Sequence, residues 1–352
     1  MYKVIEVKNK KERELFEKLP KRIYNKYDLT QDISTEHEIL TGVHVLNKYF
    51  QIFPYIVIKE NEVVSRAALT IYPDDSIAYI GFFESINDSV AVKLLFDEIE
   101  RLAKSKKIKT IQGPVDASFW IKYRLKINKF DKKPYTAEPY NKEYYLKFFM
   151  ENGYLSKMHY VSNTFPIVTN EVFDSSFEKR LEEMKSKGYT IVSPKANEFE
   201  NIIKQVYKLI IKLYSDFPAF KFIEENDFLC LFKKLKLIIK YNMVKIAYKE
   251  NEVAGFFISI PNYQNAVYSN INYLKLLKTK LFPKEYVMLY MGVDAKHKGL
   301  GMALTESIRQ ELYKNKCSSI GALVMDGKKN KKYYQNFISE QYEYLLLEKS
   351  LV

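Results

Sequence analysis

Cysteine is scarce in this chain of 352 residues, which contains only Cys230 and Cys317, along with four histidines. The two cysteines are far apart, and neither belongs to a C-x-x-C pair or to a run with metal-ligand spacing. This pattern excludes a disulfide framework and supplies no set of zinc ligands. We therefore expect a reduced, cytoplasmic protein without a metal site.

Long apolar runs are missing as well. Charged residues interrupt every hydrophobic stretch before it reaches the roughly 20 residues that cross a bilayer, and the N-terminal segment has no apolar core of signal-peptide length. The sequence therefore predicts a soluble protein with no membrane span. At 352 residues and 47% hydrophobic composition, the chain can fill two cores, which predicts two domains.

Arginine is the third scarce residue. Seven of the 56 basic residues are arginine and the rest are lysine, within a formal net charge of +13. That charge permits an anionic partner such as a phosphorylated cofactor, a membrane surface or nucleic acid. Because arginine is the preferred reader of bases and phosphates, the lysine excess disfavours nucleic acid and favours a solvated surface.

One short sequence occurs twice. Lys-Glu-Asn-Glu-Val stands at 59–63 and again at 249–253, each time between two strand-like segments. Each copy therefore predicts a β-hairpin. A strand, a loop, an amphipathic helix and a further strand then follow in the same order in both copies, and each ends in a tyrosine-rich helix, at 141–154 and 330–340, before a β-rich tail.

This duplicated plan predicts an α/β (α+β) protein made of two related domains. The boundary falls near residue 170, which divides the chain into residues 1–170 and 171–352. Each domain is expected to contain a mixed, mostly antiparallel sheet flanked by helices.

The loop in the second copy has the features of a phosphate-binding site. Residues 293–303, Val-Asp-Ala-Lys-His-Lys-Gly-Leu-Gly-Met-Ala, leave an apolar strand and open directly into a helix. Backbone N–H groups at a helix N-terminus bind anions, and the helix dipole strengthens that interaction. The two glycines allow a ligand to approach the backbone closely. The segment therefore predicts a site for a pyrophosphate.

These residues resemble motif A of the GNAT superfamily of acyl-CoA N-acyltransferases, in which (Gln/Arg)-x-x-Gly-x-(Gly/Ala) follows a strand. Lys298, Gly301 and Ala303 fall on the three defined positions, although lysine replaces Gln or Arg at the first. The resemblance implies acetyl-CoA or another acyl-CoA as donor, no metal, and a pantetheine arm paired along the preceding strand. The cofactor-binding residues that it implies are Met291, Gly292, Val293, Lys298, Gly299, Leu300, Gly301, Met302, Ala303 and Asn330.

The resemblance continues into the last tyrosine-rich segment, where the superfamily often has Asn-x-x-Ala-x-x-Leu-Tyr. Asn330 and Tyr334 are the nearest matches, at a shorter spacing. In the family such a tyrosine protonates the departing thiolate, which implies Tyr334 as general acid, with Tyr333 as the alternative. The attacking amine must be neutral, and Glu285 is the only acid on the strand before the loop, so it is the candidate base.

The first copy lacks this chemistry. Between its strand and helix stand residues 84–90, which contain two acids, no glycine and no basic residue, and Phe149 occupies the tyrosine position. Two carboxylates would repel a pyrophosphate, and phenylalanine cannot donate a proton. We expect a degenerate GNAT-like domain that serves architecture or acceptor binding. Its segment 113–145, with Trp120 and Tyr123 among lysines and arginine, is a candidate acceptor groove.

The sequence thus predicts transfer of an acetyl or longer acyl group from coenzyme A to the amine of a small molecule or peptide, by direct attack in a ternary complex. An acyl carrier protein is an alternative donor, since it presents the same pantetheine arm. Two other functions stay open. One is aminoacyl transfer from charged tRNA to a peptide, as in tandem-GNAT transferases of cell-wall synthesis, and the other is non-catalytic acyl-CoA sensing. The acceptor, the acyl length and the oligomeric state are left open.

Overall fold

The computed structural model describes residues 1–268 and 273–352. The strands are β1 (Tyr2–Glu6), β2 (Gln51–Lys59), β3 (Glu62–Ile71), β4 (Ile77–Ser85), β5 (Thr110–Gly113), β6 (Val115–Asp116), β7 (Lys122–Tyr123), β8 (Leu125–Lys126), β9 (Leu155–Phe165), β10 (Tyr189–Val192), β11 (Val244–Lys249), β12 (Glu252–Pro261), β13 (Glu285–Val293), β14 (Ser318–Met325) and β15 (Glu340–Ser350). The α-helices are α1 (Lys10–Ile23), α2 (Ile33–Leu40), α3 (Ser89–Ser105), α4 (Tyr145–Glu151), α5 (Ser175–Ser186), α6 (Phe199–Tyr214), α7 (Glu225–Phe232), α8 (Leu235–Ile238), α9 (Tyr273–Leu281) and α10 (Leu300–Asn315). Short 3₁₀ helices are η1 (Val45–Tyr49), η2 (Ala196–Glu198), η3 (Tyr241–Met243), η4 (Lys329–Lys332) and η5 (Gln335–Phe337).

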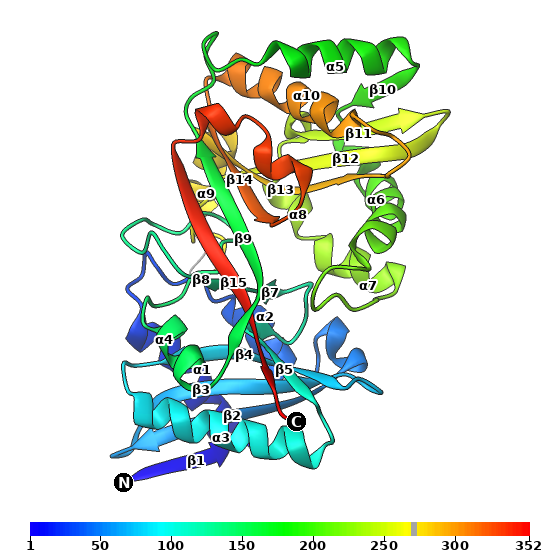
Figure 1. Ribbon diagram of the computed structural model, residues 1–352. Coiled ribbons are helices and arrows are strands. Elements are labelled where there is room, and N and C mark those ends of the chain that lie inside the picture. The colour runs from blue at the N-terminus through cyan, green and yellow to red at the C-terminus, as the bar shows by residue number, and fades with distance from the viewer. Residues whose placement is uncertain (269–272) are drawn as a thin grey trace.

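A sheet of 13 strands runs through the described part of the chain, in the order β1-β2-β3-β4-β5-β15-β9-β14-β13-β12-β11-β10 with β8 paired to β15. Its strands are mostly antiparallel, and helices flank it in two lobes (Figure 1). We call β1–β5 with α1–α4 the first lobe, and β10–β14 with α5–α10 the second lobe. This is the mixed α/β architecture that the sequence predicts.

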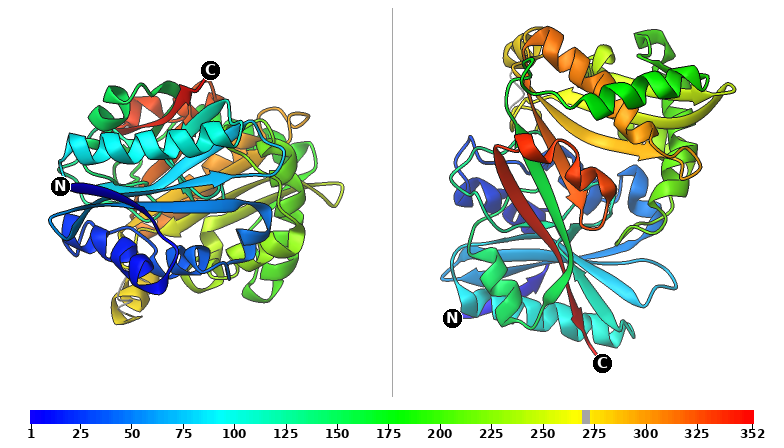
Figure 2. Two further views of the ribbon diagram at one scale, coloured as in Figure 1. Left: turned by 90° about the horizontal axis from the view of Figure 1, so that it is seen from below. Right: turned by 45° about the horizontal axis from the view of Figure 1, so that its top comes forward.

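Successive side chains of β2 pack against helices on opposite faces of the first lobe's sheet. Tyr55 and Val57 of β2 pack in one buried cluster with α3, whereas Ile56 between them packs in another cluster with α1. Seen from below, α3 and α1 lie on opposite sides of the strands (Figure 2). Asp88 caps the N-terminus of α3, because its carboxylate accepts a hydrogen bond of 3.0 Å from the amide of Ala91.

The two predicted hairpins are present and share their details. The turn residues Glu60 and Asn61 have φ of 51° and 69°, and Glu250 and Asn251 have φ of 51° and 67°. Positive φ at both central residues is typical of a two-residue turn whose twist matches the flanking strands. A register shift also follows the same position in each first strand, after Val57 in β2 and after Ala247 in β11. The repeat therefore extends to backbone geometry.

Two long strands join the lobes. β9 pairs antiparallel with β15 along most of its length, and it also pairs with β14 of the second lobe. On its other edge, the end of β15 pairs with β5 of the first lobe, from Leu347 to Ser350. Figure 1 shows β9 and β15 crossing between the lobes, with the C-terminus beside the first lobe. Because the two lobes share one sheet, the domain boundary that the sequence places near residue 170 stays a prediction.

The second tyrosine-rich segment differs from the prediction. Residues 141–154 contain the short helix α4, but 330–340 form the two 3₁₀ turns η4 and η5 in place of one helix. Tyr334 separates these turns with φ of 51°, a left-handed conformation that a continuous helix does not allow. Among the described residues, no helix combines the length and the apolar character that a membrane crossing requires.

Candidate functional site

The central strands of the second lobe separate at one end. β13 and β14 pair in parallel only from Glu285↔Ser318 to Met288↔Gly321. Beyond that point each strand has an irregularity. The β12–β13 register skips Leu289, and the β14–β9 register skips Ala322 and Leu323, of which Leu323 has a φ of 58°. Bulges bend strands. The two strands therefore diverge and leave a gap between residues 289–293 and 322–325.

The gap opens into a cleft of about 570 Å³, which we call the donor cleft. One wall is the end of β13 and the loop that follows it, and the other is the end of β14 with Lys328, Asn330 and Tyr333. Tyr214 and Phe217, at the end of α6, close a third side. Every candidate cofactor residue from Met291 to Gly301 except Leu300, together with Asn330, lines this cleft. Leu300 and Ala303 are buried behind it in the core under α10.

The loop places the N-terminus of α10 at the cleft. Gly299 stands at the N-cap position with φ of 89°, which favours glycine. Within residues 1–268 and 273–352, no backbone acceptor is recorded for the amides of Lys298, Gly299 and Gly301. Unpaired amides at the start of a helix are favourable partners for an anion, and α10 has 16 residues. The Lys298 side chain is exposed and adds positive charge beside them.

Two contacts hold this loop from behind. The carboxylate of Asp294 accepts a hydrogen bond of 2.6 Å from Lys212 of α6, and this contact lowers the pKa of Asp294. The Nδ1 atom of His297 lies 2.8 Å from the hydroxyl of Tyr189, and burial lowers the pKa of that histidine. Both side chains thus have structural partners, which leaves the backbone of the loop to face the cleft.

The phenol at the cleft belongs to Tyr333. Its hydroxyl lies 2.9 Å from the position that a Cβ atom on Gly301 would take, and Met291 lies on the other side of that position, 3.9 Å away. Burial raises the pKa of Tyr333. A neutral phenol therefore stands where the loop and the β13 strand meet.

Tyr334 points elsewhere. Its hydroxyl donates a hydrogen bond of 3.1 Å to Glu306, a buried carboxylate that also pairs with Arg309 at 2.7 Å. Its ring lies 4.5 Å from that of Phe177, between ring centroids. Burial, together with the charge of Glu306, raises the pKa of Tyr334. The hydroxyl is thus engaged outside the donor cleft, and the structure brings Tyr333 to the cleft in its place.

Glu285 lies at the wrong end of its strand for the role of base. It starts β13, whereas the cleft begins at Leu289 and ends past Val293. Its carboxylate accepts hydrogen bonds from Asn262 at 2.5 Å and from Ser318 at 3.2 Å. Among the described residues that line the cleft, Asp294 is the one with a carboxylate, and it accepts a hydrogen bond from Lys212. The proposed base is therefore not next to the loop.

A smaller cavity of about 110 Å³ lies beside the donor cleft, and we call it the apolar chamber. The two share Leu289, Met291, Ala322, Val324, Asn330 and Tyr333. The remaining walls are largely hydrophobic and come from β12, α10 and the segment after β9. An apolar space that adjoins a cleft suits a hydrocarbon chain.

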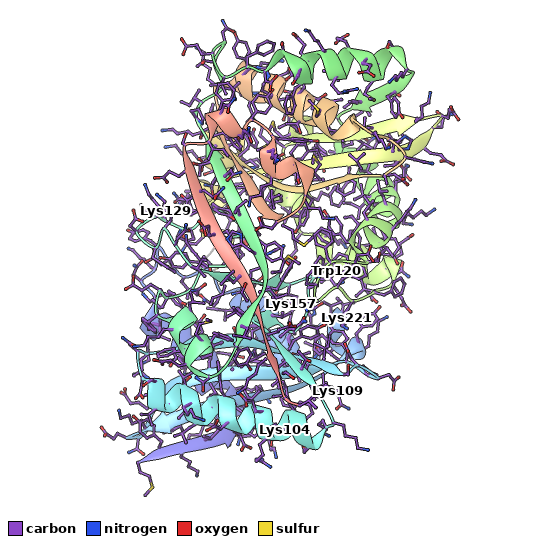
Figure 3. The ribbon with its side chains drawn as sticks, viewed as in Figure 1. Lys104, Lys109, Trp120, Lys129, Lys157 and Lys221 are labelled. Carbon is purple, nitrogen blue, oxygen red and sulfur yellow. The ribbon has the colours of Figure 1, made fainter. Side chains whose placement is uncertain are left out.

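A third cavity, of about 150 Å³, lies between the lobes and we call it the inter-lobe pocket. It shares Tyr214, Phe217, Leu289 and Leu323 with the donor cleft. The first lobe contributes its aromatic segment, including Trp120, whose indole N–H donates a hydrogen bond of 2.7 Å to the carbonyl of Lys221. Figure 3 shows both residues in the region between the lobes. Part of the candidate acceptor groove thus faces the donor cleft.

The equivalent gap in the first lobe is filled by the chain itself. A Cβ atom on Gly81 of β4 would lie 1.9 Å from the carbonyl oxygen of Val115, so the segment after β5 packs directly on β4. Glu84, at the end of β4, is buried and accepts hydrogen bonds from Tyr24 and Tyr145. Phe149 is fully buried. A cavity of about 570 Å³ lies next to this position and is lined by Phe82 and Asp116 among other residues, but the segment after β5 covers β4 itself at Gly81.

Comparison of sequences gives limited information. No family model matches the chain. Protein YghO of Escherichia coli (strain K12) is 21% identical over 220 residues, an alignment that covers 60% of this chain and 56% of that protein. The chain therefore matches just over half the length of this relative.

Comparison of structures is more informative. A tandem GNAT protein from the clavulanic acid biosynthesis pathway is similar over 100% of this chain and 99% of its own, with a TM-score of 0.54 at 9% identity. A conserved protein from Enterococcus faecalis V583 has a TM-score of 0.52 at 11% identity, over 100% and 73% of the two chains. A GCN5-related N-acetyltransferase from Kribbella flavida has a TM-score of 0.50 at 9% identity, over 100% and 72%. The chain therefore has a tandem GNAT-like fold, similar to that of these solved structures.

Proposed function

We propose that this protein transfers an acyl group from coenzyme A to an amine, with one working donor site in the second lobe. The observation that carries the proposal is the donor cleft, in which separated strands lead to unpaired amides at a helix N-terminus. The filled gap around Gly81 supports a single site. Titration calorimetry with acetyl-CoA tests the proposal, and absence of binding would overturn it.

Donor binding would use the backbone more than side chains. The pyrophosphate would accept hydrogen bonds from the amides of residues 298, 299 and 301, where the α10 dipole favours anions. The pantetheine arm would lie along Met291–Val293, whose other edge is paired to β12. Lys328, exposed on the far wall, adds positive charge for a phosphate.

Catalysis would proceed by direct attack of a neutral amine on the thioester carbonyl. The carbon–nitrogen bond forms, the carbon–sulfur bond breaks, and the thiolate takes a proton. We propose Tyr333 as the proton donor in preference to Tyr334, because its hydroxyl lies at the cleft and the hydroxyl of Tyr334 is bound to Glu306. Glu285 has no part in this proposal, and water is the expected proton acceptor for the amine.

The apolar chamber supports an acyl group longer than acetyl. It adjoins the donor cleft at Leu289, Met291 and Val324, so a chain attached to the thioester can enter it past apolar side chains. Comparing acetyl-CoA with butanoyl-CoA and hexanoyl-CoA as donors tests this part separately. An acyl carrier protein is the alternative source of the same pantetheine arm.

Two alternatives are separated by binding experiments. An aminoacyl-tRNA-dependent peptide transferase would bind charged tRNA with a steep salt dependence and would not bind coenzyme A. A non-catalytic sensor would bind acyl-CoA but release no free thiol with any amine. The proposed enzyme binds acyl-CoA and releases the thiol only when an amine is present.

A further inference from the structure

The inter-lobe pocket contains one charged side chain with unusual surroundings, that of Arg124 between β7 and β8. Its φ is 96°, although it is not a glycine. Its amide donates a hydrogen bond of 3.0 Å to the carbonyl of Pro114, which fixes this conformation. Left-handed backbone costs energy at a residue with a side chain and persists where the surroundings impose it. The fold therefore sets the direction of the Arg124 side chain.

The guanidinium is held by aromatic rings. Its Cζ atom lies 3.7 Å from the ring centroid of Tyr123 and 4.2 Å from that of Tyr160, and one terminal nitrogen donates to the hydroxyl of Tyr123. Such stacking fixes the plane of the group but leaves its charge in place. The buried Nε–H has no hydrogen-bond partner in the described structure.

The charge of Arg124 is also unpaired. Most other arginines of the chain hold a carboxylate, as Arg66 holds Glu36 and Arg309 holds Glu306. Among the described residues, Arg124 forms no ion pair with a carboxylate, and no Asp or Glu of these residues lines the pocket. The other cation of the pocket, Lys122, is paired with Asp116 at 3.1 Å. A half-buried guanidinium without an anion indicates that a ligand supplies one.

The pocket lies on the route to the reacting group. Four residues line both the pocket and the donor cleft: Tyr214 at the end of α6, Phe217 just after it, and Leu289 and Leu323 at the strand separation. A molecule bound at Arg124 therefore extends toward the gap between β13 and β14 through walls that are mainly aromatic and aliphatic. The first lobe supplies the charge, and the second lobe supplies the donor.

We propose that Arg124 binds the carboxylate of the acceptor, so that the acceptor class is an amine that also carries a carboxylate, such as an amino acid with an aromatic or aliphatic side chain. This inference rests on the proposed N-acyl transfer. The amine, once its ammonium form has lost a proton to water, attacks the thioester carbon. The carbon–sulfur bond breaks, Tyr333 protonates the departing thiolate, and the nitrogen of the new amide gives its surplus proton back to the Tyr333 oxygen. The products are an N-acyl amino acid and free coenzyme A.

The test uses pairs of acceptors that differ only in the carboxylate, namely phenylalanine with phenethylamine and tyrosine with tyramine. Release of the coenzyme A thiol from acetyl-CoA gives kcat/KM for each. The wild type is expected to prefer each acid by at least about tenfold, and Arg124→Gln to remove that preference. Arg124→Lys should retain part of it, since it keeps the charge without the fork. Arg101→Gln, an exposed arginine on α3, is the matched control.

Three outcomes decide the matter. A wild type that uses the amines as well as the acids, or an Arg124→Gln variant that keeps the preference, would overturn the proposal. If the variants unfold, wild-type inhibition by N-acetylphenylalanine is compared with that by its amide, and equal inhibition would overturn it. If acetyl-CoA does not bind, the proposed function fails. The affinities of the protein for phenylalanine and for phenethylamine, each measured by calorimetry without acyl-CoA, then test the Arg124 site alone.

Discussion

The hydroxyl of Tyr333 lies 2.9 Å from the position that a Cβ atom on Gly301 would take, so these two residues share one small space beside the α10 N-terminus. Gly301→Glu would fill this space and place a negative charge where a pyrophosphate is expected. We predict that acetyl-CoA binding is lost, as measured by calorimetry.

The duplicated fold offers a matched control for this change. Ser89→Glu places the same side chain at the N-terminus of α3, the equivalent helix of the first lobe, where Ser89 is exposed. We predict unchanged acetyl-CoA binding for this variant. Loss of binding in Ser89→Glu, or retention in Gly301→Glu, would contradict a single donor site in the second lobe.

The two neighbouring tyrosines should separate catalysis from stability. Tyr333→Phe removes the hydroxyl at the cleft, and we predict that kcat falls by about 10²-fold or more while acetyl-CoA affinity changes little. Tyr334→Phe removes the hydrogen bond to the buried Glu306. We predict that it lowers the free energy of unfolding by about 1 kcal/mol and leaves kcat within a few fold. The reverse pattern would restore Tyr334 as the general acid.

The pH dependence of kcat should distinguish the ionisation of the acceptor amine from that of Tyr333. Burial raises the pKa of Tyr333 above its ordinary value, so the hydroxyl stays protonated and able to donate throughout the neutral range. We predict that kcat rises with pH as the acceptor ammonium loses its proton, and that any fall attributable to Tyr333 begins only above about pH 10. Steady-state rates across this range provide the measurement. An alkaline fall near pH 8 would indicate a different proton donor.

Local sequence predicted the hairpins because the geometry of a two-residue turn depends on few neighbours. Asn61 and Asn251 adopt positive φ, as the repeated letters suggested, and Gly299 does so at the predicted loop. Tyr334 also has positive φ, but nothing in its neighbours indicates this. The left-handed conformation of Tyr334 divides the expected helix into two short turns. As a result Tyr333 reaches the cleft and Tyr334 does not.

Features that depend on distant strands were beyond prediction. The strand separation arises from irregularities at Leu289 and Leu323, which are aliphatic residues in ordinary strand sequence. The insertion of β15 between β5 and β9 joins segments more than two hundred residues apart. Arg124 was visible only as one basic residue in an aromatic segment, because its lack of a carboxylate partner is a property of the folded chain.

The apolar chamber makes donor length testable. A Cβ atom on Gly321 of β14 would lie 3.4 Å from Phe165 and 3.6 Å from Met288, so a larger side chain would project into the chamber. We predict that Gly321→Val reduces kcat/KM for hexanoyl-CoA by about tenfold or more and leaves acetyl-CoA nearly unaffected. Equal losses for both donors would place the acyl chain elsewhere.

The shared sheet makes the two lobes depend on each other for stability. Leu347 of β15 is fully buried in the cluster that includes α3, and it pairs with Gly113 of β5, although it lies only five residues before Val352. Leu347→Ala should lower the free energy of unfolding by about 2–5 kcal/mol, because it removes buried methyl groups from the first lobe.

Because β9 and β15 belong to the same sheet as both lobes, we predict one cooperative thermal transition for the whole chain. Leu347→Ala should lower that transition, and acetyl-CoA, which we propose to bind only the second lobe, should raise it as a whole. Val352→Ala, at an exposed terminal residue, is the control and should leave it unchanged. Two transitions, of which acetyl-CoA shifts one and Leu347→Ala shifts the other, would mean that the lobes unfold independently despite their common sheet.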